Sequence, residues 1–474
     1  MKRNGSKTLK VLLLAAPLIL GTVGLCSSGE SVVNALFHSI TMYGMEYGED
    51  PANWLVQLAR WLAPVATAGG VISFITPLVN MIKARFALLF GNSVAVYGDE
   101  DAADDMAASG RYRVLKGEDP LLPAKKYILL WDESTNIAFY RKYQEKLKKR
   151  EVYFRCEALR SQDTADAHLH PICPEETGAR LYWKQADIWP LSRERGHKLS
   201  IVLIGFGPLG EQLLIWGLQS NIFDPRQQIS YHIYGEATTF PALHHELSRI
   251  SDGVVFHDPD WSRDYDILQG ADRIIVCRQD NQLRTVQELL LALPACRLDI
   301  LADDPQALKL MEGQDRMHLF CWKEEALKPE NVFDEMTLKR AKAINLRYAH
   351  LYDGVAETKQ NREKEWEKLD AFTRYSNISA ADYHEIRLQM FAAWKDGNPN
   401  APLDAGELEL LSELEHIRWC RYHYLNNWQC GKPENGKKKD PLHRIHQDLI
   451  PYEQLSESEK EKDRENIRLM MEIS

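Results

Sequence analysis

The spacing of apolar and polar positions changes near residue 90. Before it, two long apolar runs, at residues 11–26 and roughly 62–81, flank a shorter mixed segment. After it, short β-rich runs alternate with stretches at helical spacing. Long apolar runs are typical of membrane-spanning helices, and alternating strands and helices are typical of parallel α/β domains. The sequence therefore predicts an α/β protein with N-terminal membrane helices, tandem Rossmann-like parallel sheets and a small, mostly helical C-terminal domain.

Charged residues orient the two apolar runs. The first follows a basic segment (Lys2, Arg3, Lys7 and Lys10), and the second precedes Lys83 and Arg85. The connection at residues 27–53 contains acidic residues but neither lysine nor arginine. Basic residues favour the cytoplasmic side of a membrane. Residues 1–90 are thus predicted to form two transmembrane helices of a multi-pass bacterial inner (cell) membrane protein, with both termini and most of the chain cytoplasmic.

The connection itself has two interpretations. Residues 33–50 are too apolar for a plain exposed loop and too short for another crossing. A re-entrant pore loop satisfies both limits, and so does an amphipathic interfacial helix followed by a polar turn. The segment Gly44, Met45, Glu46, Tyr47 and Gly48 resembles the Thr-Val-Gly-Tyr-Gly filter of two-helix potassium channels. With Glu46 in place of the first glycine, the resemblance implies a ring of carboxylates that favours inorganic cations by charge.

Residues 91–196 begin the α/β part with a strand, Gly98 and a helix. Further strands are expected at residues 127–131 and 152–156, and a last one near 181–184. A single glycine leaves little room for a pyrophosphate to approach the backbone. We therefore interpret this unit as a degenerate Rossmann-like domain and assign no ligand to it.

Residues 197–335 contain a better defined motif. An apolar strand leads into Gly205, Gly207 and Gly210, and an amphipathic helix follows; Phe206, Pro208 and Leu209 stand between the glycines. In this GxGxxG spacing the first glycine permits a tight turn, the second admits a phosphate, and the third lets helix and strand approach. The unit is therefore predicted to be a dinucleotide-type Rossmann domain whose cofactor is NAD, NADH or another adenine nucleotide.

Three polar residues complete the predicted nucleotide site. Asp258 and Arg278 follow strands, so they are expected at the carboxyl edge of the sheet, where ligands bind. The acid that holds the ribose is expected about 20 residues after the glycines, and Glu236 is the nearest candidate. Three alternatives stay open: NAD is bound, a different adenine nucleotide is bound, or the glycines only pack.

Two membrane helices followed by tandem Rossmann units resemble the regulator-of-potassium-conductance (Trk-type NAD-binding) domains of prokaryotic channels and transporters. The resemblance covers residues 9–330 approximately. It implies a homo-oligomeric cytoplasmic ring, expected here as a homo-tetramer, that converts nucleotide or ion binding into opening or closing of a pore.

The C-terminal part consists of two segments. Residues 336–400 are rich in lysine, glutamate and arginine, which predicts a helical connector with a solvated face. Residues 401–474 carry a distinctive framework of Glu415, His416, Trp419, Trp428, Gly431, His446, Asp448, Leu449, Pro451, Tyr452, Leu455, Asp463 and Arg464. This framework resembles the ryanodine-receptor (RyR) repeat, which implies a small helical domain.

Part of this framework is a candidate ligand site: His416, Trp419, Trp428, Asp448, Tyr452, Asp463 and Arg464. Aromatic faces stack on nucleobases, and the charged groups suit phosphate or ribose; the same side chains also suit the core of a small domain. Both interpretations stay open. The resemblance to bacterial proteins with this repeat implies that the ligand is a nucleotide or an NAD-derived signal.

Composition excludes several classes of function. The net charge is −10, with acidic and basic residues mixed along the chain, which argues against a nucleic-acid partner. The eight cysteines lack paired spacing, so we expect neither a metal site nor disulfides. No cluster of acid, base and nucleophile stands out, and the chain is expected not to be an enzyme.

The sequence therefore predicts a nucleotide-gated membrane effector or ion channel that opens a weakly selective cation pore in the lipid bilayer. The resemblance to bacterial proteins with the RyR repeat implies a role in phage defence or stress signalling. One alternative is a housekeeping potassium channel or transport regulator controlled by NAD or NADH. A second is a membrane-anchored, NAD-dependent reductase.

Overall fold

The chain forms two compact units in the computed structural model. One comprises residues 1–95 and 117–125, and the other comprises residues 96–116 and 126–474. The structure describes residues 3–48, 53–90, 92–117, 120–156, 168–302, 305–306, 308–310, 314–333, 335–398, 401–434 and 436–472.

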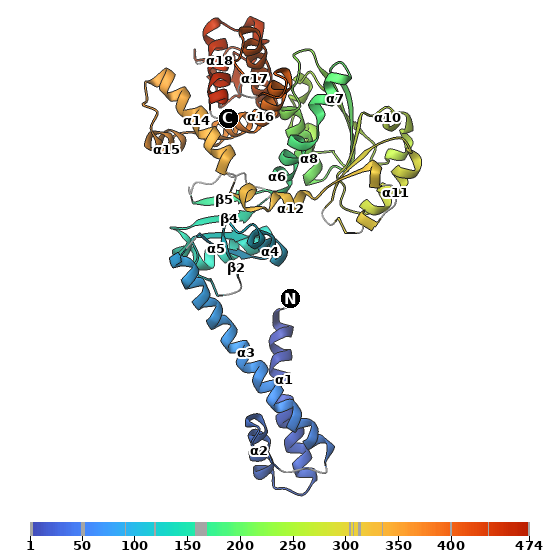
Figure 1. The fold of residues 1–474 in the computed structure, drawn as a ribbon, viewed down its shortest axis with the longest axis vertical. Helices are drawn as coiled ribbons and strands as arrows, with labels where there is room; N and C mark the ends of the chain where they lie inside the picture. The colour runs from blue at the N-terminus through green and yellow to red at the C-terminus, as the bar shows by residue number, and fades with distance from the viewer. Residues whose placement is uncertain are drawn as a thin grey trace. The chain divides into compact units, whose positions relative to one another are not determined.

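The first unit is helical. It contains α1 (Arg3–Ser27), α2 (Val32–Thr41), a short 3-10 turn (Met42–Gly44) and α3 (Trp54–Phe90), and α1 and α3 lie side by side (Figure 1). A bilayer crossing requires about 20 predominantly apolar residues in one helix. Among the described residues, no helix combines the necessary length and apolarity. The N-terminal membrane helices expected in the fold class are therefore wrong.

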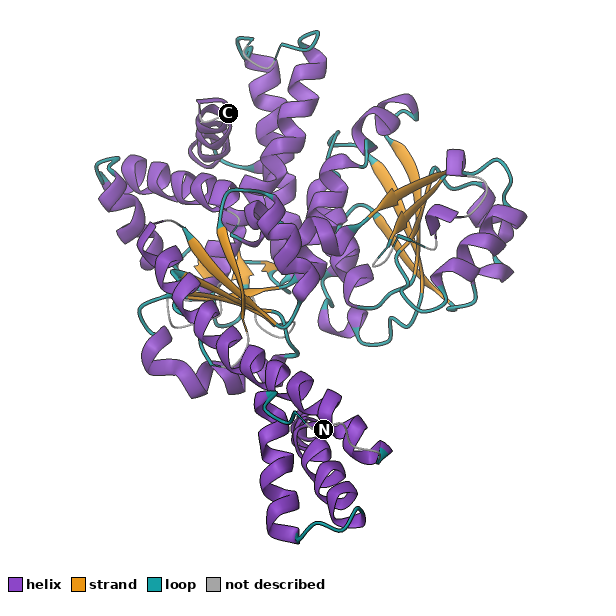
Figure 2. Cartoon of the chain, turned by 60° about the horizontal axis from the view of Figure 1, so that its bottom comes forward, coloured by secondary structure: helices purple, strands orange, loops and turns teal. Residues whose placement is uncertain are grey.

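Tandem parallel sheets follow along the chain, as predicted, and Figure 2 shows both with helices around them. The first has the strand order β2-β1-β3-β4-β5. Its strands are β1 (Ser93–Tyr97), β2 (Arg113–Gly117), β3 (Lys126–Leu129), β4 (Glu151–Arg155) and β5 (Leu169–Ile172), with α4 (Glu100–Ala108) and α5 (Glu133–Leu147) between them. The strands β3, β4 and β5 are paired in parallel.

The strand expected near residues 181–184 is instead part of helix α6 (Pro174–Gln185). Proline at the helix start and two glutamates in the first turn favour this helix. Its aromatic run is buried against α8 (Pro208–Ser220), where the Trp183 indole donates to the Leu213 carbonyl at 2.9 Å. The short apolar run predicted a strand because such runs occur in strands and in buried helices alike, whereas the residues at the start of α6 favour a helix.

The second sheet has the order β11-β10-β9-β6-β7-β8, all parallel, which is the doubly wound Rossmann arrangement. Its strands are β6 (Lys198–Ile204), β7 (Gln228–Tyr234), β8 (Gly253–His257), β9 (Arg273–Val276), β10 (Leu298–Leu301) and β11 (Met317–Phe320). Its helices are α7 (Ile188–Glu194), α8 (Pro208–Ser220), α9 (Phe240–Leu243), α10 (Tyr265–Gln269), α11 (Gln282–Ala292), α12 (Trp322–Ala326) and α13 (Pro329–Val332).

The rest of the second unit is mostly helical. It contains α14 (Glu335–Asp353), α15 (Lys359–Glu367), α16 (Ala371–Trp394), α17 (Ala405–Leu425) and α18 (Glu457–Glu472). Between α17 and α18 the short strands β12 (Gln429–Cys430), β13 (Lys439–Asp440) and β14 (Ile445–His446) form a small sheet. We call residues 401–472 the C-terminal domain. Its helix α17 begins with a capping box between Asp404 and Glu407.

Buried ion pairs fasten the C-terminal domain to the Rossmann sheet. Arg421 of α17 donates to the Asp252 carboxylate at 2.7 Å and to the Leu218 carbonyl at 3.0 Å. Both charged residues are 3% exposed. Helix α16 makes a similar contact, because Arg180 of α6 donates to Asp382 at 2.8 Å. Buried ion pairs therefore join the C-terminal domain to the Rossmann sheet, and α16 to α6.

Replacing Arg421 by methionine is expected to leave the Asp252 carboxylate buried without its cation. The free energy of unfolding should fall by about 3–5 kcal/mol, measured by chemical denaturation of the purified chain. Arg226→Met is the matched control, because the Arg226 side chain is 93% exposed and exposed ion pairs contribute about 0–1 kcal/mol. Equal stability losses in the two variants would contradict a buried anchoring role for Arg421.

Candidate functional site

The glycine motif of the Rossmann sheet adopts the expected strand-turn-helix geometry. Gly205 has φ +107°, and a Cβ there would lie 2.4 Å from the Arg278 amide nitrogen. A Cβ on Gly210 would lie 2.5 Å from the Gly205 carbonyl oxygen. A Cβ on Gly207 would meet nothing within 4 Å. Two of the glycines are therefore required by packing, and only Gly207 leaves the open space that a phosphate needs.

Phe206 of this motif packs against aromatic side chains at the edge of the sheet. Its side chain is 5% exposed, and its ring centroid lies 5.3 Å from that of Phe240 and 5.7 Å from that of Phe256. A Cβ on Gly235, just after β7, would lie 2.6 Å from Phe206. In a doubly wound sheet, ligands bind at this edge. The rings of Phe206, Phe240 and Phe256 therefore pack against one another at this edge.

The polar residues predicted beside the motif have local partners or are exposed. Arg278 donates to Asp280 at 2.6 Å, and Asp258 pairs with Arg263 at 3.9 Å. Glu236 and Pro208 are exposed, and Leu209 is buried. Three alternatives were open for this motif: binding of NAD, binding of another adenine nucleotide, or glycines that serve only packing. These contacts favour the third.

The predicted pore segment lies in the first unit, after α2. Gly44 ends the 3-10 turn, and Met45 is left-handed with φ 63°. Met45, Glu46 and Gly48 are exposed, whereas Tyr47 is buried in the helical core. Both interpretations of the segment included a helix, and α2 is present. The pore interpretation required flanking membrane helices. Because no described helix is long and apolar enough to cross a membrane, the pore interpretation is no longer supported.

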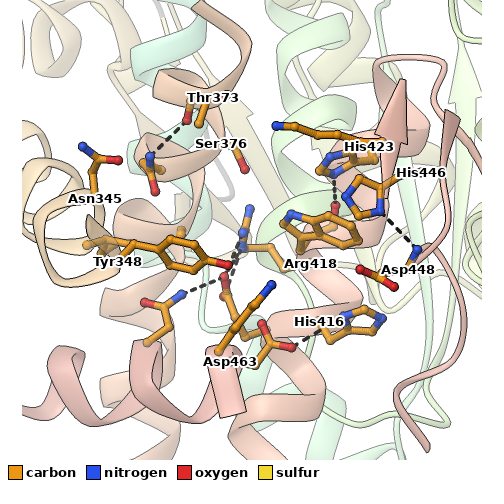
Figure 3. A pocket seen from close by; sticks show the side chains of 18 of the residues that line it. Asn345, Tyr348, Thr373, Ser376, His416, Arg418, His423, His446, Asp448 and Asp463 are labelled. Carbon is orange, nitrogen blue, oxygen red and sulfur yellow. Dashed lines mark hydrogen bonds and ion pairs between the residues drawn. The ribbon is translucent and has the colours of Figure 1, made fainter. Parts of the chain in front are cut away.

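A cavity of about 740 Å³ lies between α14, α16 and the C-terminal domain. This volume is within the range of small-molecule sites. Predicted residues that line it are His416, Trp419, Trp428, Asp448 and Asp463. Figure 3 shows Asn345 and Tyr348 of α14 on one side of the cavity, with His423 and His446 on the other. The connector and the C-terminal domain thus build one pocket together.

The remaining predicted residues, Tyr452 and Arg464, are not among those that line this pocket. Arg464 donates to Glu409 at 2.8 Å and is also bonded to Glu457 and Glu461. Tyr452 is 6% exposed, with its ring beside His416. Both residues stabilise the domain, as the core interpretation of the framework allowed.

Buried charges form the floor of the pocket. The Glu415 carboxylate accepts hydrogen bonds from Arg387 at 2.8 Å, from Arg418 at 2.8 Å and from Asn466 at 3.1 Å. Burial opposes the charge on Glu415, but the two guanidiniums hold its pKa below the usual value. Arg418 also donates to the Ser379 hydroxyl at 3.0 Å. Glu415 and Arg418 line the pocket and Arg387 contacts Glu415 from outside the lining; the three groups together carry one net positive charge, which favours an anionic ligand.

His416 adds a second charged pair at the pocket. Its Nε2 lies 2.8 Å from the Ile450 carbonyl oxygen, and its Nδ1 lies 3.6 Å from the Asp463 carboxylate. Burial opposes protonation of His416, but interactions with Asp463 and Cys420 raise its pKa to about 11. Both ring nitrogens lie near acceptors, which favours the protonated ring, while burial raises the pKa of Asp463.

The other two histidines of the pocket are neutral. Burial lowers the pKa of His423 well below its ordinary value, and burial also lowers the pKa of His446 to about 4. His423 donates through Nδ1 to the Trp419 carbonyl at 2.8 Å. The Asp448 amide donates to His446 Nδ1 at 3.1 Å. One wall of the pocket therefore carries uncharged imidazoles held by backbone groups.

Sequence reasoning missed the side of the pocket formed by α14 and α16. Tyr348 and Tyr352 are 44% and 46% exposed, and Lys462 Nζ lies 5.9 and 5.5 Å from their ring centroids. The connector was interpreted as a solvated helix because of its charges. Two tyrosines at i,i+4 spacing in a charged helix were the available signal, since they share one helix face.

Among the described residues, no group of histidine, cysteine, aspartate or glutamate side chains suits a metal ion. The described cysteines are free thiols. The chemistry of the pocket is therefore aromatic, cationic and hydrogen-bonding.

A family model for the RyR domain matches residues 406–473. The predicted C-terminal RyR repeat is thereby confirmed. No curated protein and no solved structure matches the chain. The comparisons thus identify the domain that supplies α17, α18 and the histidines of the pocket.

The neutral histidines predict a pH dependence of stability. The unfolded chain protonates His423 and His446 near pH 6.5, but the folded chain does so only at lower pH, so the unfolded state binds more protons between these values. Stability should therefore fall from pH 6.5 toward pH 4, by at most about 1.4 kcal/mol per pH unit for each histidine. His416 binds its proton in the folded chain throughout this range, whereas the unfolded chain takes it up only near pH 6.5, so His416 opposes the decrease near pH 6.5 and adds little slope below about pH 5.5.

Urea denaturation at about pH 5.5, 5 and 4.5, where His416 is protonated in both states, measures this dependence. His446→Gln should give a shallower decrease than the unchanged chain, because one proton-binding difference is removed. A denaturation midpoint that stays constant or rises on acidification would contradict the neutral state of these histidines.

Proposed function

We propose that this chain is a nucleotide sensor whose ligand, an adenine nucleotide or an NAD-derived signal, binds between the connector helices and the RyR domain. One observation carries the proposal. The 740 Å³ pocket combines a floor with excess positive charge, exposed tyrosine rings and neutral hydrogen-bonding imidazoles. Phosphate, nucleobase and ribose are the ligand groups that match these three features.

The Rossmann sheet is better suited to receive the signal than to bind the nucleotide. Phe206 fills space beside the glycine motif, and Arg278 is engaged by Asp280. A hydrogen-bond chain leads from the pocket floor to this sheet: Arg418 donates to Ser379, and Ser379 donates to Gln219 of α8 at 2.7 Å. A ligand that moves Arg418 therefore acts on a Rossmann helix through Ser379.

Transmission requires that the ligand bind one arrangement of the two domains better than another. The buried contacts from α17 to Asp252 and Leu218 supply a second route to the same sheet. In this proposal the resemblance to regulator-of-potassium-conductance domains concerns signal transfer through Rossmann units. A pore would require membrane helices, and the proposal concerns nucleotide sensing alone.

Isothermal titration of the purified chain with ADP, ADP-ribose, NAD, NADH and cyclic AMP tests the proposal. At least one should bind, and Tyr348→Ala should weaken it about tenfold, because base–aromatic stacking contributes about 1–3 kcal/mol. Tyr265→Ala is the matched control: Tyr265 is 47% exposed on α10, and its removal should leave affinity unchanged.

Gly207→Ala distinguishes the two candidate sites. The added Cβ meets no protein atom within 4 Å, so the fold should be kept while a phosphate at the glycine turn is obstructed. Binding by this variant should equal that of the unchanged chain. Loss of binding in Gly207→Ala, with full binding in Tyr348→Ala, would place the ligand at the Rossmann motif and overturn the proposal.

A further inference from the structure

Two imidazoles on the pocket wall have a fixed hydrogen-bonding polarity. His423 Nδ1 faces the Trp419 carbonyl oxygen at 2.8 Å. A carbonyl only accepts, so Nδ1 carries the proton, and in a neutral ring Nε2 then has a lone pair. The side chain is 4% exposed, with the aromatic rings of Phe372, Trp419 and Trp428 around it. His423 therefore presents an acceptor.

His446 has the opposite polarity. Its Nδ1 lies 3.1 Å from the Asp448 amide nitrogen. A backbone N–H only donates, so Nδ1 is the unprotonated nitrogen, and Nε2 of the neutral ring carries the hydrogen. His446 therefore presents a donor. Because backbone groups fix both rings, neither polarity depends on a mobile side chain.

The two rings form one recognition surface. Their centroids are 5.9 Å apart, with the ring planes at 70°, and both residues line the pocket (Figure 3). Within the described residues, neither Nε2 has a hydrogen-bond partner. The pocket wall therefore offers a hydrogen-bond acceptor beside a hydrogen-bond donor. A ligand with a donor beside an acceptor would match them.

We propose, on the basis of the proposed function, that His423 and His446 select adenine by its edge. His423 Nε2 accepts from the exocyclic amino group, and His446 Nε2–H donates to the adjacent ring nitrogen. Hypoxanthine and guanine carry a carbonyl oxygen where adenine carries its amino group. When the rest of the nucleotide is held in place, that carbonyl oxygen faces the lone pair of His423 Nε2. Both atoms are acceptors, so no hydrogen bond forms between them.

The test is isothermal titration of the intact chain with ADP, IDP and GDP at pH 7.5. These probes share ribose and diphosphate and differ at the base. ADP should bind at least about tenfold more tightly than either of the others, as expected for loss of a base-edge hydrogen-bond pair. This comparison needs no variant, so it does not depend on whether a substituted pocket folds.

Variants assign the selectivity to the two residues. His423→Phe and His446→Phe keep an aromatic ring but remove Nε2, and each should bring the three affinities to within about threefold of one another by weakening ADP. His443→Phe is the matched control, because His443 is exposed, pairs with Asp440 and is not among the residues that line the pocket. It should keep the preference for ADP.

The outcomes separate this inference from the proposed function. Equal binding of ADP, IDP and GDP would overturn selection at the base edge and leave nucleotide sensing supported. Binding of none of the three, nor of any nucleotide in the wider series, would overturn both. A preference for ADP that persists in both phenylalanine variants would overturn the assignment to His423 and His446.

Discussion

The structure around the pocket depends on one buried carboxylate. Glu415 of α17 is 2% exposed, and its charge is compensated by Arg387 of α16 and Arg418 of α17. Removing one partner of such a buried pair costs about 3–5 kcal/mol, because the remaining charge is left in a poorly polarisable surrounding. Asn466 of α18 occupies a further lone pair of the carboxylate. The carboxylate of this one residue therefore joins α16, α17 and α18.

The same cluster relates the pocket to the Rossmann sheet. Arg418 is at once part of the pocket floor and a donor to Ser379, which in turn contacts Gln219. Arg421, one turn further along α17, is paired with Asp252 beside the sheet. Because these groups are buried and fully engaged, a displacement of α17 requires several partners to move together. This arrangement suits discrete states better than continuous deformation.

Sequence patterns predicted much of the fold, because turns, strands and helices depend mainly on residues that are close in the sequence. The glycine motif with its strand and helix predicted the β6–α8 turn, and the apolar runs predicted β7 to β10. The aromatic and charged framework predicted the C-terminal repeat. The expectation of membrane helices was wrong because, within the described residues, no helix is both long enough and apolar enough to cross a bilayer. Residues 181–184 were misassigned because a short aromatic run does not distinguish a strand from a buried helix.

The site was predictable only in part, because a pocket depends on tertiary contacts. His416, Trp419 and Trp428 were identified from the repeat, but Tyr348 joins them from α14, far away in the sequence. The tautomers of His423 and His446 follow from backbone partners that spacing does not reveal. Similarly, Phe206 was expected only to accompany the glycines, and its packing on Phe240 and Phe256 was not predictable from the motif.

Hydrogen–deuterium exchange of the intact chain, with and without saturating ADP, tests the central claim most directly. Ligand binding at the pocket should slow exchange at residues 345–352, 371–377 and 438–448, and leave residues 205–210 unchanged. Protection confined to residues 205–210 would contradict this account, because it would place the nucleotide at the glycine turn of the Rossmann sheet.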